Sequence, residues 1–308
     1  MTAQRPAADP PRAIAMITHA GRPGAVRVAR SLLDALSAAG VAVWLPADEA
    51  ERVCQAPGHD CIFPPDGPPP AGAELVVVVG GDGTILRAAE LALAIDAPLV
   101  GVNLGHVGFL AEVEPEDARE VAAALIHRDW QPEERTILDV SVHLGEQELW
   151  RTWALNEVSV EKLARERMLS ALLEVDHRPL SEWGCDGVIC ATPTGSTAYA
   201  WSAGGPVVWP DVAAMIVVPL SAHALFARPL VVSPESHVSI GLADGDAGAV
   251  VWCDGRRTTA APAGSRVEVT TSPQRLKFAR VHARPFTDRL VRKFDLPVSG
   301  WRETPETP

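Results

Sequence analysis

One aspartate of this chain lies in a glycine-rich turn that suits phosphate chemistry. The turn, Gly-Gly-Asp-Gly-Thr over residues 80–84, follows four consecutive valines and precedes a segment with helical spacing. Glycines let a backbone approach a ligand closely, and the N–H groups that open a helix attract anions. Asp82 is the only fixed negative charge in this turn. The segment therefore predicts a phosphate site that contains one carboxylate.

The turn differs from the two common nucleotide-binding loops. A Walker A loop ends in lysine followed by serine or threonine. The lysines of this chain lie far away in the sequence, at 162, 277 and 293. A Rossmann fingerprint, G-x-G-x-x-G, is also absent from the turn. Backbone N–H groups, a divalent metal or an arginine must then balance the phosphate charge, and Arg87 is the nearest arginine. Two alternatives stay open: Asp82 only caps the helix, or Arg87 is a solvated helix charge.

The second half of the chain places polar residues beside predicted strands. Asn156-Glu157 pairs an amide with a carboxylate, which can hold the vicinal hydroxyls of a ribose but also fits a plain turn. Asp186-Gly187 equally fits an ordinary β-turn. Residues 192–199, Thr-Pro-Thr-Gly-Ser-Thr-Ala-Tyr, gather hydroxyls at a predicted helix start and include the chain's one tyrosine, which can stack on a ring or pack in a core. A serine hydrolase is disfavoured, because no G-x-S-x-G elbow surrounds Ser196.

The first half of the chain alternates strands and helices. Strands are predicted over 13–17, 41–45, 74–79 and 98–102, and helices over 24–39, after the glycine turn, and over 115–127. The valine run lacks polar alternation, as in a strand of a parallel sheet that is covered on both faces. Ligands of such sheets bind at the carboxyl ends of the strands, where Asp82 lies. We predict an α/β N-terminal domain with a Rossmann-like parallel sheet over 1–130.

After residue 130 the hydrophobic pattern changes to a period of two. Strands are predicted over 137–144, 149–160, 169–175, 188–191, 215–218, 237–242, 250–253 and 267–270, with a single helix at 196–203. This pattern predicts a mostly β domain over 131–280. The segment 281–308 is expected to return to the N-terminal domain, and its polar, proline-containing end is expected to fray.

Composition narrows the class of protein. The 308 residues have room for two domains, and 27 basic against 39 acidic residues give a net charge of −12. Nucleic acid and anionic membranes are disfavoured as partners, because both prefer basic surfaces. No apolar run reaches the ~18 residues of a membrane span, and no secretory signal opens the chain, so a cytoplasmic protein is expected. Five cysteines without a C-x-x-C pair predict reduced, structurally neutral thiols.

Four segments, taken in order, resemble the NAD kinase family. They are the glycine-aspartate turn at 80–84, Asn-Leu-Gly-His-Val-Gly-Phe-Leu at 103–110, the Asn-Glu pair at 156–157, and the longest signature at 186–206. The similarity runs from about residue 13 to residue 301. Diacylglycerol and sphingosine kinases share the first motif, whereas the segment at 192–199 is highly specific to NAD kinases. The resemblance implies that the C-terminal β domain is sandwich-like.

The resemblance also implies an activity. A phosphoryl group from ATP, or also from polyphosphate, would pass to the adenosine ribose 2′-hydroxyl of NAD, giving NADP, with Mg²⁺ or another divalent cation as cofactor. No direct protein ligand is assigned to that metal. NAD kinases form homodimers or homotetramers, in which a neighbouring subunit can complete the dinucleotide pocket. NAD and ATP are thus the expected small-molecule partners.

By the same resemblance, Asp82 would accept the proton of the ribose hydroxyl. The residues implied in NAD binding are Asp82, Gly83, Arg87, Phe109, Asn156, Glu157, Arg167, Asp186, Thr197, Ala198, Tyr199, Ser202 and Arg256. Those implied in binding the ATP phosphates are Gly80, Gly81, Gly83 and Thr84. Gly184 stands where some members carry arginine, so the choice between NAD and NADH stays open.

Two other functions are weighed against this one. A lipid kinase would share the glycine turn but needs an apolar entrance, and the acidic charge and the polar second-half motifs argue against it. A catalytically silent NAD(H) sensor would keep the pocket and lose the carboxylate at position 82, where the chain has Asp82.

Overall fold

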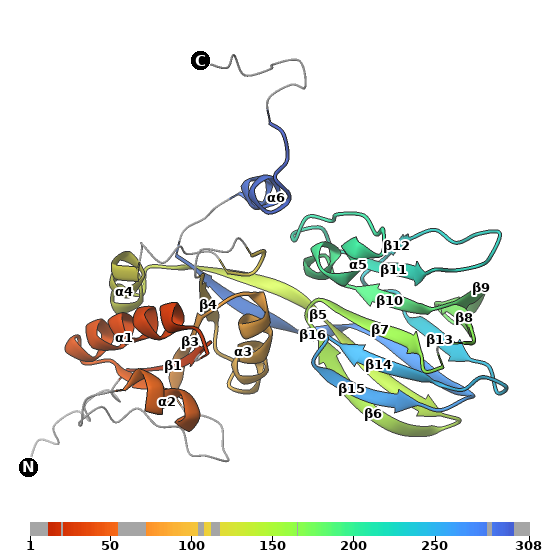
Figure 1. The fold of residues 1–308 in the computed structure, drawn as a ribbon, viewed down its shortest axis with the longest axis horizontal. Coiled ribbons are helices and arrows are strands. Elements are labelled where there is room, and N and C mark those ends of the chain that lie inside the picture. Colours follow the sequence, from red (N-terminus) through yellow and green to blue (C-terminus); the bar gives the residue numbers. More distant parts are fainter. Residues whose placement is uncertain are drawn as a thin grey trace, which may run out of the picture. The chain divides into compact units, whose positions relative to one another are not determined.

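The computed structural model describes residues 12–19, 21–54, 72–103, 108–111, 118–164, 166–281 and 285–298. The chain divides into two compact units (Figure 1). The first unit comprises Met1–Glu133 together with Lys277–Pro308, and the second comprises Glu134–Leu276. The tail that is expected to fray, 302–308, lies outside the described residues.

The first unit contains a parallel sheet. Its strands are β1 (Ala13–Thr18), β2 (Ala42–Trp44), β3 (Ala73–Val79) and β4 (Leu99–Val102), in the order β2-β1-β3-β4. Strand β3 pairs in parallel with both β1 and β4, and its four valines are fully buried. Valine suits this place because its branched side chain packs well on a pleated surface. The predicted buried strand in a parallel sheet is confirmed.

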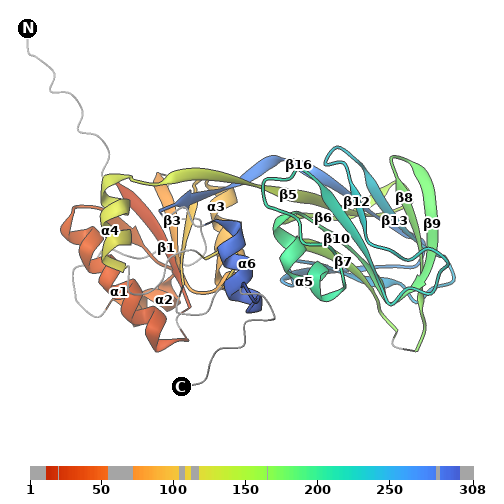
Figure 2. The same cartoon turned by 90° about the horizontal axis from the view of Figure 1, so that it is seen from above.

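Helices cover the sheet of this unit. They are α1 (Pro23–Ala38), α2 (Ala47–Val53), α3 (Asp82–Ala94), α4 (Ala118–His127) and α6 (Phe286–Phe294). Figure 2 shows α1 and α4 on one face of the sheet and α3 on the other. The prediction over 115–127 is right from residue 118, and 115–117 lie outside the described residues. Helices α2 and α6 were not predicted. Helix α2 has only seven residues, and α6, whose apolar residues do recur at helical spacing, has only nine.

The second unit is a sandwich of two sheets. One has the order β6-β5-β16-β13-β8-β9 and the other the order β12-β11-β10-β7-β14-β15. The strands of the first sheet are β5 (Gln131–Leu144), β6 (Gln147–Ala154), β8 (Leu169–Val175), β9 (Arg178–Cys185), β13 (Val238–Leu242) and β16 (Ser265–Arg280). Those of the second are β7 (Glu157–Lys162), β10 (Gly187–Ala191), β11 (Met215–Leu220), β12 (Leu230–Val232), β14 (Ala249–Cys253) and β15 (Arg257–Ala261).

Residues of both sheets form one apolar core in this unit. Trp183 and Val140 contribute from the first sheet, and Val158, Val188 and Val251 contribute from the second, all fully buried. Alternating side chains of two facing sheets that share one core define a β-sandwich. The predicted fold class, an α/β domain followed by a mostly β, sandwich-like domain, is confirmed. No helix among the described residues is long and apolar enough to cross a membrane.

Several predicted elements of the second unit are wrong in extent. The predicted strand 149–160 is two strands, because the Asp254 carboxylate accepts the N–H groups of Leu155 and Asn156 between them. The predicted helix 196–203 is a 3-10 turn, η2 (Thr194–Thr197), and a single helical turn, α5 (Tyr199–Ser202). They are separate because the backbone of Ala198, with φ −103° and ψ −126°, lies outside the helical region. Strand β16 is longer than 267–270, since it continues through a Ser-Pro-Gln sequence that indicates a turn.

Candidate active site

The carboxylate of Asp82 binds a segment that is distant in sequence. Strand β3 ends at Val79, and α3 begins at Asp82 after the Gly80-Gly81 turn. The two carboxylate oxygens of Asp82 accept the backbone N–H groups of Phe109 and Leu110, each at 3.1 Å. The helix cap residue is Gly81, with no side-chain cap bond. Asp82 is therefore directed at the second motif, and the plain helix-cap alternative is not supported.

The glycines around Asp82 serve two different purposes. A methyl group on Gly108 would overlap the Asp82 carboxylate, and one on Gly80 would lie 2.7 Å from Cβ of Thr84. At these two positions the protein itself requires glycine. A methyl group on Gly81 or Gly83 would meet no described atom within 4 Å, and neither residue has positive φ. Packing does not explain these two glycines, whereas close approach of a ligand to the backbone does.

Arg87 forms an ion pair with a buried glutamate. Its Nη2 lies 2.5 Å from Oε1 of Glu49 and also donates to the carbonyl of Thr18 at 2.9 Å. Glu49 comes from α2 and is only 1% exposed, and it also accepts the N–H of Thr18. Arg87 is thus not a solvated helix charge. The predicted contact of Arg87 with substrate stays a prediction. Glu49 was not singled out from the sequence, because the helix that carries it, α2, was not predicted.

In the second unit, the Asn-Glu pair and the 192–199 segment lie together. Asn156 and Glu157 are both buried, and Oε2 of Glu157 accepts the N–H of Tyr199 at 3.3 Å. The carbonyl of Asn156 accepts the N–H of Thr192 at 2.9 Å, and the Thr192 hydroxyl donates to the carbonyl of Leu155 at 2.6 Å. These bonds join two motifs that the sequence separates by more than thirty residues. They also leave Tyr199 more than one-third exposed.

Asp254 organises this cluster, and sequence analysis missed it. Its carboxylate accepts the N–H groups of Leu155 at 3.0 Å and Asn156 at 2.7 Å, and it pairs with Nη2 of Arg257 at 2.7 Å. Its own N–H donates to the carbonyl of Glu157. The available signal was an Asp-Gly pair after a strand, which ordinary turns also show. Asp254 has positive φ, as such turns require.

Burial sets the protonation of the Glu157 carboxyl. Burial, and secondly the nearby charge of Asp254, raises its pKa to about 8, against a slight lowering by the Tyr199 N–H. Burial also raises the pKa of Asp254, although Arg257 and two backbone N–H groups oppose that shift. At neutral pH Glu157 is therefore a neutral acid, able to donate one hydrogen bond and accept others. Such a group suits hydroxyl ligands.

We expect the Glu157→Gln variant to lose less stability than the wild type as the pH rises. A folded-state pKa above the ordinary value of about 4.3 means that the folded protein holds a proton that the unfolded chain releases. The stability that this retained proton adds to the folded state is complete below about pH 4.3 and is lost as the pH rises through about 8. Melting temperatures at pH 6.5 and 9 measure it. Glu146→Gln, at an exposed glutamate, is the control, and its melting temperature should fall between the two pH values as much as that of the wild type. An equal fall for Glu157→Gln and the wild type would contradict the raised pKa of Glu157.

The other predicted residues of the second unit occupy its surface. Asp186 pairs with Nζ of Lys162 at 2.5 Å, and this hydrogen bond holds the pKa of the Asp186 carboxyl below its ordinary value. Ser202 is exposed, and Thr197 and Ala198 are half-buried around the break between η2 and α5. Arg167 is exposed next to Met168, and Arg256 follows the Asp254 turn. Their predicted contacts with NAD stay predictions.

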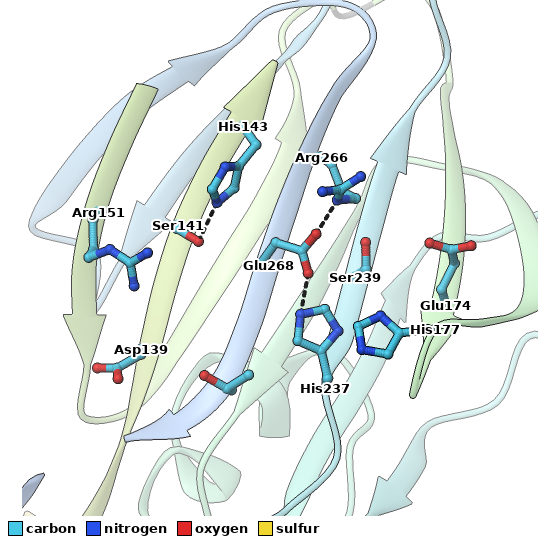
Figure 3. Close-up of a pocket in the computed structure, with 11 residues that line it drawn as sticks. Asp139, Ser141, His143, Arg151, Glu174, His177, His237, Ser239, Arg266 and Glu268 are labelled. Atoms are coloured by element: carbon cyan, nitrogen blue, oxygen red, sulfur yellow. Dashed lines mark hydrogen bonds and ion pairs between the residues drawn. The ribbon is translucent and has the colours of Figure 1, made fainter. Parts of the chain in front are cut away.

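One cavity of the second unit lies away from these residues. It has a volume of about 510 Å³ and opens on the outer face of the β6-β5-β16-β13-β8 sheet (Figure 3). Figure 3 shows His237 and Arg266 directed at Glu268, and His143 at Ser141. None of the predicted site residues lines it. Among the described residues, no three histidine, cysteine or acidic side chains are placed to hold a metal ion. We interpret this cavity as a polar sheet face, on which Glu268 pairs with Arg266 of the same strand and with His237 beside the neighbouring strand.

Solved structures identify the class to which this fold belongs. The crystal structure of yeast NADH kinase complexed with NADH has a similar fold, with a TM-score of 0.84, 23% identity, and coverage of 96% of this chain and 91% of that one. An NAD kinase from Archaeoglobus fulgidus in complex with ATP gives a TM-score of 0.68, with 27% identity and coverage of 92% and 100%. The fold is that of two-domain dinucleotide kinases.

Sequence comparison assigns the family. Residues 69–130 match the ATP-NAD kinase N-terminal domain, and residues 155–281 match the ATP-NAD kinase C-terminal domain. The NAD kinase of Thermobifida fusca (strain YX) is 51% identical over 298 residues, covering 94% of this chain and 91% of that protein. That of Leifsonia xyli subsp. xyli is 52% identical over 294 residues, covering 94% and 97%. The chain belongs to the NAD kinase family.

Proposed function

We propose that this protein transfers a phosphoryl group from ATP to the adenosine ribose 2′-hydroxyl of NAD and so forms NADP. One observation carries the proposal beyond family membership. Asp82 is fixed by two backbone N–H groups inside a turn whose glycines, Gly81 and Gly83, leave room that packing does not use. A held carboxylate beside an open, N–H-rich turn is what a hydroxyl acceptor and a phosphate donor require together.

Asp82 orients the hydroxyl and takes its proton. Each of its oxygens accepts one N–H bond, which leaves lone pairs for the hydroxyl of the substrate. The transition state of phosphoryl transfer is loose and rich in negative charge, so alignment and electrostatic stabilisation supply most of the acceleration. Among Gly80, Gly81, Gly83 and Thr84, the N–H groups of Gly81 and Gly83 bind the donor phosphates. Those of Gly80 and Thr84 donate to the carbonyls of Val102 and Gly81, so these two residues shape the turn.

The second unit holds the dinucleotide. Glu157, neutral at pH 7, and Asn156 bind ribose hydroxyls, and Tyr199 offers an exposed ring beside them. Phe109, Arg167, Asp186, Thr197, Ala198, Ser202 and Arg256 complete the proposed set of NAD contacts, together with Arg87. This assignment rests on the resemblance and on the bonds that join Glu157 to Tyr199.

A divalent cation, Mg²⁺ in the first instance, accompanies ATP. Mg²⁺ keeps several waters and binds through substrate phosphates with one or two carboxylates, so it needs no protein cage. The turn around Asp82 fits such an ion, because it combines one carboxylate with open space. When bound, the ion neutralises phosphate charge. We also propose a homodimer or homotetramer, as the family resemblance implies, and a cytoplasmic location.

A coupled assay of NADP formation tests the function. Purified protein is supplied with ATP or polyphosphate as donor and with NAD or NADH as acceptor, with and without Mg²⁺. We expect NADP from ATP and NAD, and no product after chelation of the metal. Absence of product from every pair would overturn the proposal and favour a silent NAD(H) sensor. Binding to liposomes in a flotation assay, without NAD phosphorylation, would favour a lipid kinase.

A further inference from the structure

The last helix of the chain contacts the segment that holds Asp82. Helix α6 belongs to the first unit, and two of its aromatic residues flank the ring of Phe109. The ring centroid of Phe109 lies 6.0 Å from that of Phe286 and 5.7 Å from that of Phe294, both in tilted geometry. Tilted pairs at these distances are favourable aromatic contacts. Phe109 is only 8% exposed as a result.

An arginine of α6 also binds the backbone of this segment. Nη1 of Arg289 donates to the carbonyl of Phe109 at 3.0 Å. That carbonyl belongs to the same peptide group as the N–H of Leu110, which donates to Oδ1 of Asp82. A cation on the carbonyl side of a peptide polarises its N–H and strengthens the bond that the N–H makes. Arg289 is thus linked to Asp82 through one peptide group.

A second C-terminal arginine supports the next carbonyl. Arg280, at the end of β16, is 6% exposed and forms an ion pair with Glu133. Its Nη1 lies 3.4 Å from the carbonyl of Leu110, which makes this a weak bond. Both carbonyls of the 109–110 segment therefore face arginines from the end of the chain. Their N–H groups face Asp82.

We propose that α6 positions the Asp82 carboxylate for catalysis, with Arg289 and Phe294 as positioning residues that act through residues 109 and 110. The inference rests on the proposed function, in which Asp82 orients the ribose hydroxyl. Displacement of a catalytic group by about 1 Å can cost on the order of 10²-fold in rate. A loosened 109–110 segment would free the carboxylate to move while leaving the dinucleotide contacts of the second unit unchanged.

The test is a double-mutant cycle on NADP formation. Arg289→Gln in otherwise wild-type protein should lower kcat about tenfold and raise the KM for NAD by a smaller factor, since Phe109 is only one of the proposed NAD contacts. In the Asp82→Asn background, the same substitution should change kcat by less than about twofold, because the group it positions is gone. Arg289→Lys keeps the charge and should restore part of kcat. Phe294→Leu leaves the charge of α6 unchanged and loosens the aromatic contact with Phe109, so it should also lower kcat by a larger factor than it raises the KM for NAD.

Arg292→Gln, at an exposed arginine of the same helix, is the charge-matched control and should keep full kcat. Melting temperatures of all variants identify any that fail to fold. Unchanged kcat in both Arg289→Gln and Phe294→Leu would overturn this inference and leave the proposed function standing. An equal loss in the wild-type and Asp82→Asn backgrounds would do the same, since it indicates a general structural effect. An inactive wild-type protein would instead overturn the proposed function.

Discussion

Asp82→Asn should lower the turnover number for NADP formation by a factor on the order of 10² or more, while NAD still binds. The substitution keeps the size of the side chain and removes its capacity to take a proton. Since all but one of the proposed side-chain contacts with NAD come from other residues, and asparagine can still bond the ribose hydroxyl, the dissociation constant for NAD should change little. Initial rates with ATP and NAD give kcat, and isothermal titration with NAD gives the affinity.

The Asp82→Asn experiment needs a control for charge and stability. An asparagine offers one oxygen to the two N–H groups of Phe109 and Leu110, so some stability is lost as well. Asp96→Asn makes the same change of charge at the far end of α3, at an exposed side chain that pairs with Lys277. Exposed pairs contribute about 0–1 kcal/mol, so this variant should remain active. Full activity in Asp82→Asn would remove Asp82 from the mechanism.

The Asp82 turn could be predicted from sequence because its signals are local. An unbroken valine run, a glycine turn and helical spacing follow one another within thirteen residues, 74–86. Each of these signals predicts the same unit, a strand followed by a turn and a helix, without knowledge of distant segments. The structure adds what local signals cannot provide. The partner of Asp82 lies at 109–110, and only the folded chain shows that Gly108 must lack a side chain there.

The residues that support the site were not predictable in the same way. Glu49 and Asp254 are acidic residues in segments that are expected at the surface, yet both are buried and bonded to backbone N–H groups of residues distant in sequence. Burial of a charge is decided by such long-range partners. Helix α6 was missed for a related reason. Its apolar residues recur at helical spacing over only nine positions, and the ring of Phe109, on which its aromatic residues pack, is distant in sequence.

The break in the predicted helix 196–203 has a similar origin. Hydroxyls at 192–197 indicate a helix start, but they are used for other bonds. Ser196 donates to the carbonyl of Pro193 and receives the N–H of Val208, and Thr192 binds the carbonyl of Leu155. Hydroxyl side chains that bind nearby backbone compete with helical bonding. The result is an irregular segment held closely against Asn156.

Gly195→Ala should destabilise the second unit and weaken NAD binding more than any other single methyl addition considered in this protein. The added methyl would overlap the carbonyl oxygen of Asn156 and lie 2.8 Å from its Cα. Backbone cannot yield as a flexible side chain does, so the 194–197 turn or the 156–157 segment must move. Overpacking of this kind costs typically about 1–3 kcal/mol. Urea unfolding measures the loss of stability, and initial rates over a range of NAD concentrations give the KM.

Movement of Asn156 would also break the bond from the N–H of Thr192 to its carbonyl and displace the neighbouring Glu157. The KM for NAD should therefore rise at least about tenfold, the effect of losing roughly 1.4 kcal/mol of binding. Gly245→Ala is the matched control in the same unit. Its methyl would meet no described atom within 4 Å, and its φ is not positive, so stability and KM should both stay near wild type. A Gly195→Ala protein with wild-type KM would show that the contact between the two motifs does not shape the NAD site.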